Sequence, residues 1–151
     1  MRMAELLFHK AIVSVGPPFF ARCQGDQVPA IRILHVDDEP DVREVVELSL
    51  GLEPDFVTQS CGSGEEALAI ATDWKPDLVL LDLVMPKMGG VMTLARLRID
   101  PKLRMPVVFM TGCYRKAHGT EYFRSLGAAG VIFKPFEAAN LAASVRGYLY
   151  R

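Results

Sequence analysis

Short apolar runs alternate with amphipathic segments along the chain from Ile31 to its end. Five runs have the length and residue types of buried strands, at positions 31–36, 56–61, 78–81, 106–110 and 131–133. The segments between and after them carry apolar residues at helical spacing and predict helices at 39–50, 67–74, 91–99, 116–126 and 137–150. This alternation favours one doubly wound α/β domain, a parallel sheet with helices on both faces.

Local signals support the helix assignments. Pro40 suits a first helical turn, where its missing N–H is not needed, and Ser63 with Glu66 has the spacing of a capping box. The stripes expected to face the core are Val42, Val45, Val46 and Leu50 in the first helix, and Leu141, Val145 and Leu149 in the last.

The first thirty residues differ from the rest. Their apolar stretch is interrupted by Glu5, His9 and Lys10, and the Gly16-Pro17-Pro18 run breaks any helix. A signal peptide needs a cleaner apolar centre, so this pattern disfavours one. We therefore expect an N-terminal extension at 1–30, ordered at least in part, and a folded domain at 31–151.

Composition excludes several classes of protein. Half of the 151 residues are hydrophobic, which supports a core, while a net charge of −1 gives no reason to expect direct nucleic-acid binding. No apolar run is long enough to cross a membrane. The three cysteines form no C-x-x-C pair, so reduced thiols and a cytoplasmic protein are expected.

Charged residues stand where three of the predicted strands end. Asp37 and Asp38 follow the first strand, Asp82 the third and Lys134 the fifth. In an open parallel sheet the carboxyl ends of neighbouring strands line one crevice, where ligands bind. Clustered carboxylates repel each other unless a cation joins them, and oxygen ligands favour a hard cation such as Mg²⁺. Taken singly, the same residues are also typical of helix caps and turns.

Four motifs in order resemble the receiver domain of bacterial two-component response regulators, specifically a single-domain, chemotaxis-regulator-like member. They are the opening segment 33–40, the acceptor segment 80–86, the pair Thr111-Gly112 and the lysine motif 134–136. The resemblance covers residues 31 to 151 and implies a (βα)5 flavodoxin-like fold with strand order 2-1-3-4-5.

The resemblance implies a role for each acidic residue. Asp82 would accept a phosphoryl group from a phosphohistidine and form an acyl phosphate. Asp38 and Asp82 would bind Mg²⁺ directly, together with the backbone carbonyl of Val84, and Asp37 would act through a water or by direct contact.

The resemblance also implies roles for two residues on the last two strands. Lys134 would pair with a phosphoryl oxygen, and Thr111 would donate its hydroxyl to another and shift the end of its strand. The Lys134–Pro135 peptide would be cis.

Two departures from the family pattern concern the switch. Val131 stands where receivers commonly carry Tyr or Phe, which puts the rotation of an aromatic ring in doubt. Phe133 projects to the face opposite Ile132 and is not an obvious substitute. Gly112 replaces the commoner alanine and leaves open space beside the site.

We therefore expect a phosphoacceptor signalling domain, not an enzyme acting on other substrates. Its partners would be a sensor histidine kinase or histidine phosphotransfer protein and a downstream protein target, with a homodimer left open. Because the chain ends after the fifth helix, no output domain is expected. The alternatives are a phosphohydrolase with an aspartyl-phosphate intermediate, which Val84 disfavours as the residue two after the nucleophile, and an interaction module that signals without phosphorylation. A flavodoxin-like nucleotide-binding module is a third, but the chain has neither G-x-G-x-x-G nor a P-loop.

Overall fold

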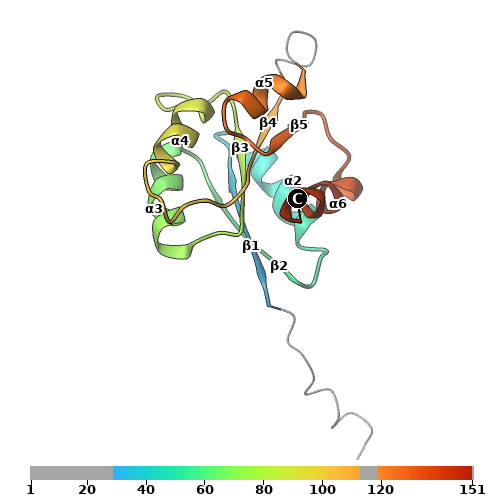
Figure 1. Ribbon diagram of the computed structural model, residues 1–151. Helices are drawn as coiled ribbons and strands as arrows, with labels where there is room; N and C mark the ends of the chain where they lie inside the picture. Colours follow the sequence, from blue (N-terminus) through green and yellow to red (C-terminus); the bar gives the residue numbers. More distant parts are fainter. Residues whose placement is uncertain (1–28, 113–118, 151) are drawn as a thin grey trace, which may run out of the picture.

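The computed structural model describes residues 29–112 and 119–150. A five-stranded parallel sheet in the order β2-β1-β3-β4-β5 forms its centre (Figure 1). The strands are β1 (Ile31–Val36), β2 (Phe56–Cys61), β3 (Leu78–Asp82), β4 (Val107–Thr111) and β5 (Gly130–Phe133). The helices are α2 (Pro40–Leu50), α3 (Gly64–Trp74), α4 (Gly90–Leu97), α5 (Thr120–Ser125) and α6 (Ala138–Leu149). The predicted doubly wound fold and strand order are confirmed.

Helices cover both faces of the sheet, and each face has its own apolar core. On one face, α3, α4 and α5 pack with alternate strand residues such as Leu34, Leu81 and Phe109. On the other face, α2 and α6 pack on Ile33, Leu80 and their neighbours. The central strand β3 is buried along its whole length, as expected of a parallel strand covered on both sides. Such packing makes the sheet a rigid support for the residues at its carboxyl edge.

The boundaries of some elements differ from those expected. β4 includes Thr111, which was expected to follow the strand, and α4 ends at Leu97, two residues early. Within the described part of the chain, α5 begins at Thr120, and the predicted helical residues 116–118 lie outside it. The extension predicted at 1–30 also lies almost wholly outside the described residues.

The N-terminal residues of α2 and α3 are those that the sequence signals predict, but the hydrogen bonds at the start of α3 differ in one respect. Pro40 is the first residue of α2. Ser63 Oγ accepts a hydrogen bond from the backbone amide of Glu66 at 3.2 Å, and its hydroxyl donates to the Glu66 carboxylate at 3.0 Å. The glutamate thus contacts the cap side chain rather than its backbone amide, a variant of the predicted box.

One predicted core position is wrong. Val46 and Leu50 are fully buried, but Val45 is 45% exposed. The buried stripe of α2 is narrower than its apolar pattern: the helix packs on β1, β2 and α6, while Val45 lines a surface groove with Val42 and Phe136. In the last helix, Leu141 and Val145 are buried and Leu149 packs against them, as predicted. None of the described helices has the length and apolar character needed to span a membrane.

Candidate functional site

A cleft of about 300 Å³ opens at the carboxyl edge of the sheet, at the ends of β1, β3, β4 and β5. The residues that line it are Asp38, Glu39, Asp82, Val84, Thr111, Gly112 and Lys134. Five of the six residues singled out from the sequence therefore line the cleft, and the sixth, Asp37, lies buried beside it and contacts Lys134.

Asp37 is fully buried at the end of β1, and protein donors hold both of its carboxylate oxygens. The backbone amide of Glu39 donates to Oδ1 at 2.9 Å, and Lys134 Nζ donates to Oδ2 at 2.6 Å. Arg43 Nη1, from α2, donates to the backbone carbonyl of Asp37 at 2.6 Å. A buried carboxylate needs such hydrogen bonds. Here they also hold in place the loop between β1 and α2, which carries Asp38.

Asp82 ends β3 with only 5% of its surface exposed. Burial raises the pKa of its carboxyl from 3.8 to about 6; the Lys134 ammonium opposes this shift, and the Asp37 carboxylate adds to it. Its Oδ1 atom lies 3.5 Å from Lys134 Nζ, a longer contact than the lysine makes with Asp37. The Lys134 ammonium therefore offsets the burial of the Asp82 carboxylate only in part.

The loop after Asp82 returns close to the strand end at Gly90. A Cβ atom built at this position would lie 2.3 Å from the Asp82 carbonyl oxygen and 2.9 Å from Leu83 Cα. The Gly90 amide donates to the Leu83 carbonyl at 3.0 Å, which ties the start of α4 to the end of β3. Only a glycine permits this approach, so Gly90 holds the backbone of the acceptor segment in place.

Lys134 connects three carboxylates across the cleft. Its Nζ lies 2.6 Å from Asp37, 3.5 Å from Asp82 and 4.0 Å from Glu39. Burial disfavours the ammonium, but the hydrogen bond to Asp37 and the neighbouring carboxylates outweigh it and raise the pKa of Lys134. The Lys134–Pro135 peptide is cis, as predicted. The lysine is therefore charged and positioned for an anion in the cleft.

The acidic cluster fits a hard divalent cation. One carboxylate oxygen from each of Asp37, Asp38 and Asp82 lies within 4.8 Å of the other two. The donors are all oxygens, and Asp38 is the most accessible of the three carboxylates. Protein donors occupy both oxygens of Asp37, so Asp38 and Asp82 are the better direct ligands and Asp37 suits contact through water. A ligand role for the carbonyl of Val84, whose side chain is 56% exposed in the cleft wall, stays a prediction.

Thr111 lies at the cleft end of β4 and is 1% exposed. The backbone amide of Lys134 donates to the Thr111 carbonyl at 2.9 Å. A shift of the end of β4 would therefore also move the end of β5. A Cβ added to Gly112 would meet nothing closer than 3.9 Å, which confirms the open space expected there.

Val131 is buried in the core on the α3–α5 side of the sheet. Phe133 shares that side, stands in register with Thr111, and packs edge-on against Phe123 with ring centroids 6.3 Å apart. The aromatic ring beside Thr111 is therefore Phe133. Phe133 stands two residues after Val131, so both side chains lie on one face of the strand.

Arg43 and Glu39 were not predicted as parts of the site. Their contacts with Asp37 and Lys134 depend on how α2 sits at the end of β1. The arginine alone gave no signal, because helix-surface arginines are common.

This fold and site define a phosphoacceptor module of the response-regulator type. The family model described as the response regulator receiver domain matches residues 33–146, and the chain belongs to this family. It is a signalling domain of two-component systems, and receiver domains generally bind Mg²⁺ at such an acidic pocket.

Known proteins with similar sequences support this family assignment. The chain is 38% identical over 122 residues to the DNA-binding response regulator MtrA of Mycolicibacterium smegmatis, covering 80% of this chain and 51% of that protein. It is 36% identical to the regulatory protein AtoC of Escherichia coli, covering 73% of this chain and 23% of the relative. The chain thus spans about half or less of the length of these relatives.

Solved structures agree on the fold. The receiver domain of NtrX from Brucella abortus superposes with a TM-score of 0.69 at 30% identity, covering 78% of this chain and 97% of that one. The chemotaxis protein CheY4 of Vibrio cholerae superposes with a TM-score of 0.70, covering 79% and 98%, and at 24% identity it speaks for the fold alone.

Proposed function

We propose that this receiver domain belongs to a phosphorylation-activated response regulator and that Asp82 is its phosphoacceptor. Asp82 takes the phosphoryl group from a phosphohistidine of a kinase or phosphotransfer protein. The observation that carries this assignment is the Asp82 carboxylate itself, in a cleft between a charged lysine and two further aspartates.

The chemistry is a displacement at phosphorus. An oxygen of Asp82 attacks, the P–N bond to the donor imidazole breaks, and the electron pair returns to that imidazole, which takes a proton. A carboxylate is a weak nucleophile, so catalysis rests on positioning and charge compensation. Asp38 and Asp82, with the Val84 carbonyl and with Asp37 through water, would hold Mg²⁺, which would supply positive charge beside the transferring oxygens.

Two residues of the chain hold the other phosphoryl oxygens. Lys134 Nζ turns from Asp37 to the phosphoryl group; it lies 3.5 Å from the acceptor carboxylate already. Thr111 donates its hydroxyl and draws the end of β4 inward, and Phe133 and the aromatic residues it contacts repack. Because the end of β4 then has two arrangements, phosphorylation of Asp82 changes the surface that a partner protein contacts.

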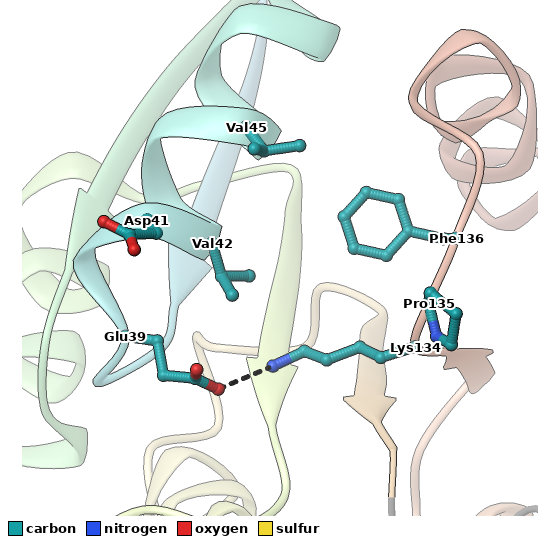
Figure 2. Close-up of a pocket in the computed structure, with 7 residues that line it drawn as sticks. All are labelled: Glu39, Asp41, Val42, Val45, Lys134, Pro135 and Phe136. Carbon is teal, nitrogen blue, oxygen red and sulfur yellow. Dashed lines mark ion pairs between the residues drawn. The ribbon is translucent and has the colours of Figure 1, made fainter.

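The donor protein must contact the rim of the cleft, and an apolar groove of about 490 Å³ borders that rim. Figure 2 shows Val42 and Val45 on α2 facing Phe136, with Glu39 and Lys134 at one end. We propose this groove as the docking site of the phosphohistidine-bearing protein. Val45→Asp should slow transfer from that protein but not from acetyl phosphate. Val57→Asp is the matched control, since Val57 is also 45% exposed but lies on the edge strand β2.

The primary test is incubation with Mg²⁺ and acetyl phosphate, followed by intact-mass measurement. The native chain should gain one phosphoryl group, Asp82→Asn none, and the control Asp100→Asn, at a half-buried loop aspartate that does not line the cleft, as much as the native chain. Labelling of Asp82→Asn at the native site and rate would refute the assignment.

We further propose residues 31–151 as the receiver domain, residues 1–30 as an extension, and the cytoplasm as its location. The downstream target is a protein, and direct nucleic-acid binding is not proposed. The phosphohydrolase alternative would need a general acid–base group near the acceptor, where the chain offers Val84.

A further inference from the structure

A buried histidine lies beneath the acidic cluster. His35, on β1, is fully buried on the side of the sheet that α2 and α6 cover, and neither ring nitrogen has a hydrogen-bond partner among the described residues. Its Nε2 atom lies 3.9 Å from Asp37 Oδ2. An apolar side chain would fill this strand position without leaving polar atoms unpaired, so the imidazole costs stability in this state.

The oxygen that His35 faces is the one that Lys134 occupies. Lys134 Nζ donates to Asp37 Oδ2 at 2.6 Å and lies 3.5 Å from Asp82 Oδ1. When the lysine turns to a phosphoryl group on Asp82, Asp37 Oδ2 loses its charged donor inside the protein. A buried carboxylate left short of a hydrogen bond is expensive.

We propose that His35 is a positioning residue that donates its Nε2–H to Asp37 Oδ2 when Lys134 leaves for the phosphoryl group. The inference rests on the proposed function. A shortening of about 1 Å brings the 3.9 Å separation to ordinary hydrogen-bond length. A carboxylate oxygen accepts more than one hydrogen bond, so a metal-bound water can share Oδ2 with the imidazole.

The required tautomer needs a donor to Nδ1, and the neighbouring strand carries a hydroxyl at the paired position. Ser60 is the register partner of His35 on β2, and its buried hydroxyl also has no hydrogen-bond partner among the described residues. A hydroxyl rotates to suit its neighbours and can donate to Nδ1, which leaves Nε2 as the protonated nitrogen.

The first test is spectroscopic and uses the native protein. Beryllofluoride with Mg²⁺ serves as the phosphoryl mimic, and NMR of ¹⁵N-labelled protein follows the His35 ring. We expect the Nε2–H proton to move downfield and exchange more slowly at saturation. Saturated binding with an unchanged His35 signal overturns the inference.

The second test uses variants. His35→Leu should weaken beryllofluoride binding about tenfold, near the lower end of what a hydrogen bond to a charged group contributes. His35→Gln, which keeps a donor at the Nε2 position, should restore most of the affinity. Mg²⁺ binding without beryllofluoride should stay unchanged, because Lys134 then still holds Asp37. Thr58→Val is the matched control, since Thr58 also has a buried hydroxyl without a hydrogen-bond partner among the described residues, but stands in register with Ile33.

The outcomes separate the two proposals. If the native chain binds no beryllofluoride, the proposed function fails and this inference with it. If native binding is normal and His35→Leu binds equally well, only the role of His35 is refuted. Equal loss of Mg²⁺ and beryllofluoride binding in His35→Leu would show a merely structural role and also overturn it.

Discussion

The acceptor carboxylate should destabilise the metal-free protein at neutral pH. Burial raises the pKa of Asp82 from 3.8 to about 6. A difference of about 2 units corresponds to about 3 kcal/mol between the protonated and ionised forms. Asp82→Asn removes that charge with little change in shape, and the pKa of about 6 already includes the opposing attraction to Lys134. We therefore expect the variant to be more stable than the native chain by about 1–3 kcal/mol at pH 8.

The pH dependence has a definite sign. Below pH 3.8 the carboxyl is protonated in both the folded and unfolded states, so the variant and the native chain should unfold with similar free energies. Between pH 3.8 and about 6 the folded state binds the proton more tightly, so native stability falls as pH rises. Above pH 6 both states are ionised, and the advantage of Asp82→Asn should reach a plateau.

Urea denaturation in EDTA at several pH values between 4 and 8 measures this difference, with Asp100→Asn as a control that should show no such rise. Mg²⁺ at ten times its dissociation constant should add about 1.4 kcal/mol to the native chain and much less to Asp82→Asn. An advantage of Asp82→Asn that is absent at pH 8, or that is equally large at pH 4, would refute the reasoning.

Three further predictions concern the metal, the loop and the lifetime of the phosphorylated state. Asp38→Ala should weaken Mg²⁺ binding, measured by titration, and slow phosphorylation by acetyl phosphate; unchanged Mg²⁺ affinity would remove Asp38 from the site. Gly90→Ala should lower the free energy of unfolding by about 1–3 kcal/mol, because its Cβ would meet the Asp82 carbonyl at 2.3 Å, and equal stability in urea would contradict this. From their spacing after Asp82 and Thr111, the sequence predicts that Val84 and Cys113 flank the approach of water to the acyl phosphate. Cys113 lies outside the described residues, and neither side chain is a strong hydrogen-bonding group. The double variant Val84→Asn, Cys113→Glu should therefore lose the phosphoryl label faster than the native chain. An unchanged rate of label loss would contradict this prediction.

Much of the fold could be predicted because strand and helix patterns depend on local spacing. The run from Leu78 to Leu81 is apolar without interruption, which is typical of a strand covered on both faces, and β3 is such a strand. The end of β4 and the ends of α4 were misplaced, since boundaries depend on which carbonyls and amides find partners in the folded chain. Val45 was misplaced for a related reason, as its apolar character says nothing of how wide a stripe α2 buries.

The sequence by itself determined that Asp37, Asp82 and Lys134 stand at strand ends, because each directly follows an apolar run that is visible in the local sequence. It could not determine that Lys134 contacts Asp37 more closely than Asp82, at 2.6 Å against 3.5 Å, or that His35 faces the same carboxylate from below. Nor could it show that Arg43 holds the Asp37 carbonyl, or that the aromatic ring beside Thr111 belongs to Phe133. The residues in these contacts are far apart in the sequence or lie on different elements, and the strand order, the register and the packing of α2 against the sheet bring them together. Only the tertiary structure of the whole domain therefore decides these contacts.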